Sequence, residues 1–189
     1  MRKRSQLSLA LLLTLSATVH AEESKIILGL EVGSSRLDLG ADIIDDINPD
    51  ELDSGGVSAT YSMAYRWANN IVIDGSLTTS GNAFFNLGLS DFYLTSEAKV
   101  LVGYNIEIAE HFRIVPLVGI SRWDTELQES FFLNPGPEAQ GEFDGTDFSY
   151  KISAEFPLNN GFILTLSHAN TNSDIGDLRL TQAGIKFEF

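Results

Sequence analysis

The sequence predicts an all-β fold: an eight-stranded antiparallel up-and-down transmembrane β-barrel. Three observations predict it. Apolar and polar residues alternate over eight segments, which is the period of a strand whose side chains point to opposite faces in turn. Most segments are near the ~9–11 residues that a tilted strand needs to cross a membrane. The connections between them alternate between short and long. Transmembrane β-barrels likewise have short turns at one end and longer loops at the other.

The last segment, residues 178–189, has an apolar face that extends to the final residue. From Thr181 onward, one side carries Thr181, Ala183, Ile185, Phe187 and Phe189, and the other carries Gln182, Gly184, Lys186 and Glu188. Chain termini are usually polar and frayed, so an apolar face at the very end needs an apolar covering. A lipid bilayer would supply that covering.

The first 21 residues read as a secretory signal. Basic residues at positions 2–4 precede an apolar run at 7–19, and small residues before Glu22 form a plausible cleavage site. The apolar run is too short for a spanning helix of about 20 residues. The alternative is a buried N-terminal helix. The sequence therefore predicts a signal peptide at 1–21 and one barrel domain at 22–189.

Charge and cysteine content exclude several classes of function. Removing 21 residues from the 189 leaves 168, with nine basic residues against 26 acidic ones and a net charge of about −17. A nucleic-acid partner is therefore not expected, because phosphate binding needs a basic face. The chain has no cysteine, so it depends on no disulfide and uses no thiol chemistry. We expect no cofactor and no metal centre.

Four strands are expected in the first half of the chain, at 25–38, 55–68, 71–79 and 92–106. The second has the cleanest pattern, with one face made of Val57, Ala59, Tyr61, Met63, Tyr65 and Trp67. Asparagine tolerates a left-handed backbone, so a tight turn is expected after this strand at Asn69 and Asn70. The other two connections, 39–54 and 80–91, are longer. The first of them is rich in aspartate and glutamate.

Four further strands are expected at 112–124, 146–157, 162–169 and 178–189. Each alternates Phe, Ile, Leu, Val or Tyr with small or polar residues. Pro116 predicts a local bulge in the first of them, because proline cannot donate to a ladder. The links before and between these strands are short at 107–111 and 158–161, and long at 125–145 and 170–177.

Aromatic residues gather at the strand ends on the short-connection side. They are Tyr65, Trp67, Tyr104, Phe112, Phe156, Phe162, Phe187 and Phe189. A ring of aromatic side chains at one level is the interfacial girdle of a membrane barrel. The alternative is the core rim of a soluble barrel such as a lipocalin. The terminal Phe and the unequal connections favour the membrane interpretation.

The signal, the eight strands and the ending Ile185, Lys186, Phe187, Glu188 and Phe189 resemble the small eight-stranded outer-membrane β-barrel family. Its members include the OmpA-like transmembrane domain and the OmpX-like and opacity-like proteins. The resemblance covers nearly all of the chain after the signal. In the family, an amphipathic last strand with a terminal Phe is the tag read by the assembly machinery, which implies that role for Ile185, Phe187 and Phe189. The chain lacks the peptidoglycan-binding domain of the OmpA-like proteins, so wall anchoring is not implied.

The resemblance also implies a location and partners. We expect a monomer in the outer membrane of a Gram-negative bacterium, in contact with outer-membrane lipids and lipopolysaccharide. An extracellular protein is a further candidate partner. The expected role is structural and interactive, with acidic loops presented at the cell surface on a plugged barrel.

The inward face is expected to hold a polar network. By parity it contains Glu31, Arg66, Asp74, Glu97, Lys99, Arg113, Lys151, Glu155, Lys186 and also Glu188. An eight-stranded barrel is only wide enough for its own side chains, and buried charges must be paired there. The network is therefore predicted to plug the lumen. A narrow gated ion channel is the alternative.

His168 is the one candidate for catalysis. It faces outward at lipid-headgroup level and is similar in placement to the outward His of the lipid A deacylases, in which a Ser follows two residues later. Asn170 stands at that position here, and Ser167 faces inward, so the nucleophile of a triad is missing. A lipid A-modifying enzyme of deacylase type is a second alternative, and the prediction is that the protein is not an enzyme.

The acidic connection raises a calcium hypothesis. Asp46, Asn48 and Asp50 have the spacing of the first, third and fifth positions of an EF-hand loop. Glu51 replaces the required Gly and Val57 replaces the twelfth-position Glu, so the motif fails. A looser divalent site shared with lipopolysaccharide phosphates remains the alternative to a solvated loop.

Overall fold

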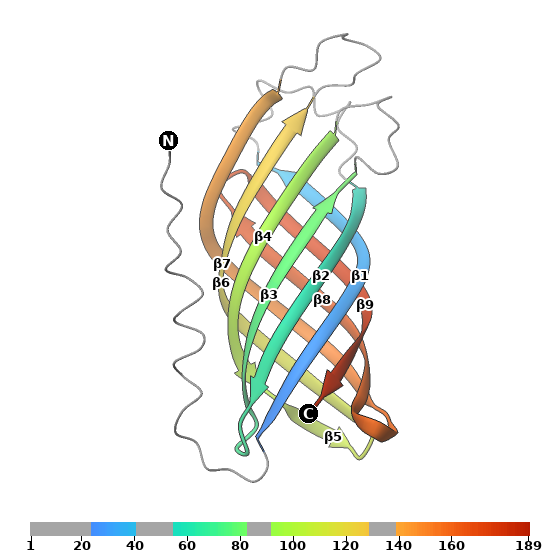
Figure 1. Cartoon of the computed structure of the whole chain (residues 1–189). Coiled ribbons are helices and arrows are strands. Elements are labelled where there is room, and N and C mark those ends of the chain that lie inside the picture. Colours follow the sequence, from blue (N-terminus) through green and yellow to red (C-terminus); the bar gives the residue numbers. More distant parts are fainter. Residues whose placement is uncertain (1–23, 41–54, 83–91, 129–138) are drawn as a thin grey trace, which may run out of the picture.

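Nine strand segments form one antiparallel sheet that closes on itself (Figure 1). The computed structural model describes residues 24–40, 55–82, 92–128 and 139–189. The segments are β1 Lys25–Leu39, β2 Gly55–Arg66, β3 Ile71–Gly81, β4 Phe92–Tyr104, β5 Ile106–Ala109, β6 Phe112–Gln128, β7 Ala139–Pro157, β8 Phe162–Ser173 and β9 Gly176–Glu188. A 3-10 turn, η1 Asn159–Gly161, links β7 to β8. No helix in this described part is long and apolar enough to cross a membrane.

The nine segments make eight staves of a barrel. The sheet order is β4-β3-β2-β1-β9-β8-β7-β6-β5, and pairing of β4 with β6 closes the ring. Segments β4 and β5 belong to one stave, because both pair with β6 in the same register, at Gly103–Leu117 and then at Ile106–Ile114. The predicted closed, eight-stranded, antiparallel barrel is confirmed.

The interruption between β4 and β5 lies opposite Pro116. The two pairs missing from the ladder are those that the register would place at Tyr104–Pro116 and Asn105–Val115. Asn105 donates its N–H to Asn70 on the other side, at 2.8 Å, so Tyr104 faces β6, where proline has no N–H to offer. The expectation of a bulge at Pro116 is wrong. The chain keeps its register there and omits two pairs from the ladder.

The strands are strongly tilted. A walk through directly paired residues starts at Ile27 on β1, crosses every stave and returns to β1 at Leu37, ten residues further on. A stagger of this size in eight strands corresponds to a tilt of about 40° and an interior just wide enough for side chains. The interior positions therefore face one another directly.

Apolar side chains cover the outside of the barrel. Tyr61, Val100, Ile152 and Ile185, from four different strands, are 66%, 46%, 48% and 54% exposed, whereas their sequence neighbours on the inward face are mostly buried. In water this distribution would be costly, at roughly 25 cal/mol for each Å² of apolar surface. It is the distribution that a barrel surrounded by hydrocarbon requires.

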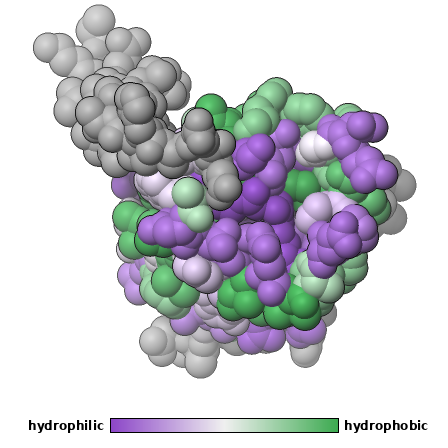
Figure 2. All heavy atoms as spheres, turned by 90° about the horizontal axis from the view of Figure 1, so that it is seen from below, coloured by the Kyte–Doolittle hydropathy of each residue, from purple (hydrophilic) through white to green (hydrophobic). Residues whose placement is uncertain are grey.

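The aromatic residues at the short-turn end pair with one another. Ring contacts join Tyr65 to Trp67 at 4.8 Å and Phe112 to Phe156 at 5.2 Å. A third group joins Phe187 to its neighbours Phe162 and Phe189. Seen from this end, hydrophilic residues gather across the middle of the barrel and apolar residues lie around much of its rim (Figure 2).

Turns at the short-turn end follow the sequence closely. Asn70 has a left-handed φ of 66°, as the expected tight turn after β2 requires, although β2 ends at Arg66 rather than at 68. The expected link at 107–111 is partly strand. Segment β5 pairs with the start of β6, and only Glu110 and His111 remain in the turn.

At the opposite end, the strands extend further than the sequence predicts. Segment β6 continues to Gln128 and β7 begins at Ala139, so all of the described part of the expected loop 125–145 is strand. The expected loop 170–177 is a tight turn at Asp174 and Ile175 between β8 and β9. Beyond the apolar band the outward face is polar, so the alternation that marks a strand is lost. The signal at 1–21 and most of 39–54 and 80–91 lie outside the described residues.

Candidate functional site: the polar interior

The inward-facing charged residues lie inside the barrel wall. Glu31 and Asp74 are 0% and 2% exposed, and the side chain of Arg66, nearest the short-turn end, is 11% exposed. The other six expected members are also buried: Glu97, Lys99, Arg113, Lys151, Glu155 and Lys186. Strand periodicity placed them there, because each occupies the same parity as the inward residues around it.

Seven of these side chains form one continuous chain of ion pairs, which we call the ionic chain. At the short-turn end, Glu188 Oε2 lies 2.8 Å from Arg66 Nη2 and 3.1 Å from Arg113 Nη2. Arg113 Nε then lies 2.7 Å from Glu155 Oε2, whose Oε1 is 2.6 Å from Lys186 Nζ. Acid and base alternate along this path, so every charge in it has a partner of opposite sign.

Glu31 joins Lys186 to Lys151, the last member of the ionic chain in the barrel interior. Its Oε1 lies 2.7 Å from Lys151 Nζ and 3.8 Å from Lys186 Nζ, and its Oε2 accepts a hydrogen bond from Ser167. The chain thus links β1, β2, β6, β7 and β9, and no two of its bonded partners are neighbours in sequence. Such a network holds the barrel walls in one relative arrangement.

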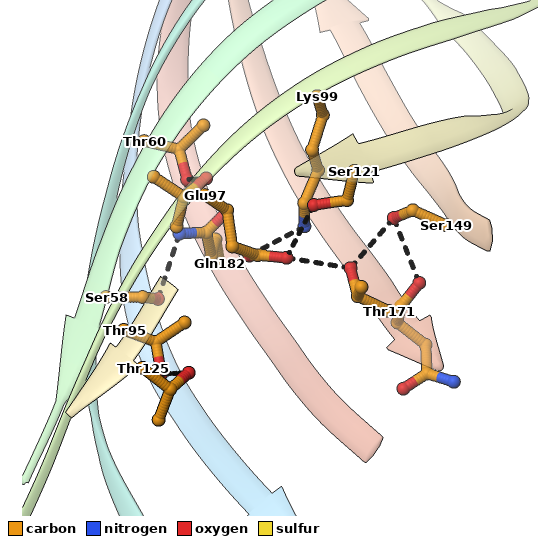
Figure 3. Close-up of polar contacts among 12 residues, drawn as sticks. Ser58, Thr60, Thr95, Glu97, Lys99, Ser121, Thr125, Ser149, Thr171 and Gln182 are labelled. Atoms are coloured by element: carbon orange, nitrogen blue, oxygen red, sulfur yellow. Dashed lines mark hydrogen bonds and ion pairs between the residues drawn. The ribbon is translucent and has the colours of Figure 1, made fainter. Parts of the chain in front are cut away.

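A second polar group, the hydroxyl network, lies further from the short-turn end. Figure 3 shows its side chains. Glu97 is at its centre. Its Oε2 pairs with Lys99 Nζ at 3.0 Å, and its Oε1 accepts hydrogen bonds from Ser121 at 3.1 Å and Thr171 at 2.8 Å. Thr171 also bonds to Ser149 at 3.0 Å. The pair Glu97–Lys99 is therefore separate from the ionic chain.

Gln182 organises the facing wall of the hydroxyl network (Figure 3). Its Nε2 donates to Ser58 at 2.9 Å and to Thr60 at 3.0 Å. Thr60 and Thr78 share a further bond of 2.8 Å. Strand alternation predicts that these side chains face inward. It does not predict which hydrogen-bond partner each of them has. For this reason these residues were not among the predicted members of the polar network.

Asp74 joins neither network. No hydrogen bond or ion pair joins its side chain to another described residue, and its Oδ1 is fully buried. It lines a small cavity of about 10 Å³, together with Ser62, Arg66, Asn105 and Lys186 on its polar side. That volume is about the minimum that holds one water molecule. A water there could donate to the Asp74 carboxylate.

Two groups of buried apolar side chains, which the sequence did not predict, share the interior with these networks, and the first lines the same small cavity as Arg66, Asp74 and Lys186. One comprises Ile27, Ala64, Val72, Leu101, Val115, Leu117 and Ile163. The other, near the end opposite the short turns, comprises Leu37, Tyr93, Leu127, Ala169, Leu178 and Leu180. The Tyr93 hydroxyl lies 2.9 Å from Ser35 Oγ, which joins β4 to β1 across the interior. The second layer therefore reaches from wall to wall.

His168 faces outward and is half-buried. Its Nδ1 lies 3.1 Å from Thr181 Oγ1 on β9. Ser167 points inward to Glu31, and Asn170 bonds to Asn172. In the described ranges no group of three or more His, Cys, Asp or Glu residues is placed to hold a metal. The calcium hypothesis at Asp46, Asn48 and Asp50 falls outside those ranges.

The C-terminal strand completes the wall between β1 and β8. Ile185 is exposed on the apolar surface, Phe187 packs between two other rings, and Phe189 is 60% exposed at the end of the strand. The backbone N–H of Phe189 donates to Ile26 at 2.9 Å, so pairing continues to the last residue. The three residues proposed as an assembly tag thus share the outward face.

Known structures share this architecture, although no family model and no curated protein matches the chain. The attachment invasion locus protein Ail of Yersinia pestis has a TM-score of 0.63 at 15% identity, covering 88% of this chain and 99% of that chain. Neisserial surface protein A gives 0.62 at 9%, covering 87% and 97%. The N-terminal β-barrel domain of Pseudomonas aeruginosa OprF gives 0.50 at 11%, covering 86% and 97%. The protein has the fold of the small eight-stranded outer-membrane β-barrels.

Proposed function

We propose that the protein is an integral outer-membrane barrel of a Gram-negative bacterium with a structural and surface-interaction role. The observation that carries the proposal is the inversion of polarity between the two faces of one sheet. Exposed Leu, Ile, Val, Phe and Tyr side chains cover the outside, and paired charges fill the inside. Hydrocarbon outside and a closed polar interior make both faces stable.

The interior acts as a plug in this proposal. The ionic chain, the hydroxyl network and the apolar layer around Tyr93 and Leu127 occupy successive levels of the lumen. The small cavity beside Asp74 has room for about one water molecule. Ions would have to displace paired side chains and an apolar layer to pass, which favours a plug over the gated channel.

The partners follow from the same arrangement. Outer-membrane lipids cover the apolar band, and lipopolysaccharide surrounds the end opposite the short turns. The signal at 1–21 directs export, and the assembly machinery reads the outward Ile185, Phe187 and Phe189. The chain acts as a monomer and presents acidic segments, including 39–54, to an extracellular protein.

A non-catalytic role is proposed for His168. Its hydrogen-bond partner is Thr181, and the neighbouring serine hydroxyl is directed into the barrel toward Glu31. This arrangement gives no support to a deacylase-type triad, which needs a serine hydroxyl within reach of the imidazole.

Two measurements test the proposal. Purified protein, folded in detergent, should migrate differently in a gel before and after boiling, because a closed barrel resists unfolding by detergent. In planar bilayers it should give no conductance steps across a wide voltage range. Regular conductance steps from the folded protein would support the gated channel and exclude the plug. Identical migration before and after boiling would argue against the barrel fold itself.

A further inference from the structure

The small cavity beside Asp74 holds two polar groups that lack a donor. Asp74 is 2% exposed, and its Oδ1 is buried without a hydrogen-bond partner. Asn105 is 1% exposed, and its Oδ1 is likewise buried without a partner. Both residues line the cavity. A buried acceptor without a donor is costly, so an occupant of this cavity must be able to donate hydrogen bonds.

The ionic chain carries a surplus of one positive charge. Its bases are Arg66, Arg113, Lys151 and Lys186, and its acids are Glu31, Glu155 and Glu188. Four positive charges therefore face three negative ones. Charge inside a protein is costly unless it is compensated. An ionised Asp74 would supply the fourth negative charge.

The electrostatic surroundings of Asp74 belong to the same chain. Lys151 and Lys186 attract its carboxylate, and Glu31 and Glu155 repel it. Lys186 also lines the cavity, and its Nζ donates to Glu155 at 2.6 Å. The distance from this Nζ to Glu31 Oε1 is 3.8 Å, which is too long for a hydrogen bond. An ammonium group has three N–H donors, so Lys186 can donate to a further acceptor.

The size and charge of the cavity select its occupant. Its volume of about 10 Å³ is near the minimum that holds one water molecule. The charges that line it balance, because Arg66 and Lys186 face Asp74 and Glu155. A bound cation would add an uncompensated positive charge. Water is neutral, and it can donate to one group while it accepts from another.

We propose that this cavity is a binding site for one water molecule, through which Asp74 acts as the fourth acid of the ionic chain. The water donates to the Asp74 carboxylate and accepts from Lys186 Nζ. The inference rests on the proposed function, because it concerns how the interior plug balances its charge. The gel and the conductance measurement test the barrel and the plug, whereas the experiments below test this site alone.

Nuclear magnetic resonance tests for the water in the native protein. The methyl group of Ala64 lines the cavity, and Ala169 lies in the other buried apolar group. The full chain, folded in detergent micelles, is labelled with carbon-13 at its alanine methyl groups. Cross-relaxation with water should be observed at Ala64 and should be absent at Ala169, which is 3% exposed.

A double-mutant cycle tests the charge balance. Asp74→Asn and Lys186→Met each leave one charge without its counterpart, so each should raise the unfolding equilibrium constant about tenfold or more in lipid vesicles. Together they remove one charge of each sign, and each remaining acid of the ionic chain keeps a base within 2.8 Å. The double variant should therefore have an unfolding constant about tenfold or more below the product of the two single effects.

Arg122→Gln provides the matched control for the cycle. Arg122 lies on the outer surface, where its side chain is 70% exposed and pairs with Asp144 at 3.1 Å. Combined with Asp74→Asn, this change should multiply the two single effects to within about twofold, because the residues share no partner. If a single interior variant does not fold in the gel assay, folding of the double variant shows the same coupling.

Asp74→Glu separates the charge from the water. The longer side chain keeps the carboxylate and extends it into the cavity by one methylene group, which can displace the water. The variant should keep the unfolding constant within about threefold of the native value, since the charge balance is unchanged. Its Ala64 methyl should lose the cross-relaxation signal with water.

Three results would contradict the proposal. No water signal at Ala64 in the native chain would mean that the cavity is dry. Unchanged stability of Asp74→Asn, or a double variant whose effects simply multiply, would mean that Asp74 does not balance the ionic chain. Stabilisation of the native chain by sodium chloride but not by choline chloride at equal concentration would identify a cation as the occupant. The native gel shift would persist in each of these cases, so failure of this inference is distinguishable from failure of the proposed function.

Discussion

Glu31 shows how a buried ion pair depends on register. It and Lys151 are 120 residues apart, yet their charged atoms lie 2.7 Å apart inside the barrel. Parity alone places each of them inward, and this much the sequence predicts. Which partner each finds depends on the stagger of the sheet, which no local pattern encodes. For the same reason the sequence does not predict that Glu97 and Lys99 are separate from the ionic chain. Nor does it predict that Asp74 belongs to neither network.

Replacing Glu31 with Ala should destabilise the barrel strongly. Lys151 has its only ion pair among the described residues with Glu31, so the change leaves a buried ammonium group uncompensated. We expect a loss of about 3–5 kcal/mol in the free energy of unfolding, measured by urea titration of protein folded into lipid vesicles. Adding Lys151→Met to the same variant should recover a large part of the loss.

The exposed pair of Arg36 and Asp38 provides the control for this variant. Their side chains are 64% and 28% exposed, and surface pairs of this kind contribute about 0–1 kcal/mol. Arg36→Gln should therefore change the unfolding free energy little. An equal loss in the Glu31 and Arg36 variants would mean that the interior charges do not hold the barrel together.

At the scale of an element, β6 shows a local defect that can be repaired. Pro116 leaves Tyr104 without an N–H donor across the ladder, and an unmet backbone carbonyl is costly next to lipid. Pro116→Val should stabilise the barrel by about 1 kcal/mol, since a ladder bond contributes about 0.5–1.5 kcal/mol. Pro157→Val, at the end of β7, serves as the control. A destabilised Pro116 variant would show that the ladder gap has another cause.

A variant in the C-terminal strand can distinguish the folding of the barrel from its assembly into the outer membrane. Phe189→Ala removes an exposed ring at the end of β9 but leaves the backbone bond to Ile26. The variant should refold in detergent as the native chain does, yet accumulate in the outer membrane at a clearly lower level, measured by immunoblot of membrane fractions. Phe156→Ala, which alters the same girdle outside the last strand, should accumulate normally. Equal accumulation of both variants would show that Phe189 does not serve as a tag for the assembly machinery.

The strands were predictable only where their two faces meet different surroundings. Within the apolar band, outward Leu, Val and Phe alternate with inward Ser, Thr and charged residues, and the sequence locates every stave there. Beyond the band, as in Glu142, Asp144 and Thr146 of β7, the outward residues are polar, so the same strand reads as a loop. The inward apolar layers were missed for a related reason. Leu101 between Val100 and Val102 interrupts the alternation without ending the strand.

At the scale of the whole molecule, the two ends of the barrel differ in every respect described. The short-turn end holds the first residue of β1, the C-terminus, the aromatic pairs and the ionic chain. The opposite end holds the apolar layer around Tyr93 and the part of β6 and β7 that extends beyond β8. An even number of staves places the start of β1 and the C-terminus on one side, which in the proposed orientation is the periplasm. The orientation decides which end of the barrel can meet an extracellular partner.

The absence of cysteine makes this orientation directly measurable. Single cysteines at Asn159 and Asp174, both exposed turn residues at opposite ends, start from a chain with no background thiol. In intact cells a membrane-impermeant maleimide should label the Asp174→Cys variant and should label the Asn159→Cys variant only after the outer membrane is permeabilised. The two cysteines report the accessibility of opposite ends of one barrel. The reverse labelling pattern would therefore show that the barrel has the opposite orientation in the membrane. Labelling of both variants in intact cells would mean that the barrel does not separate two compartments.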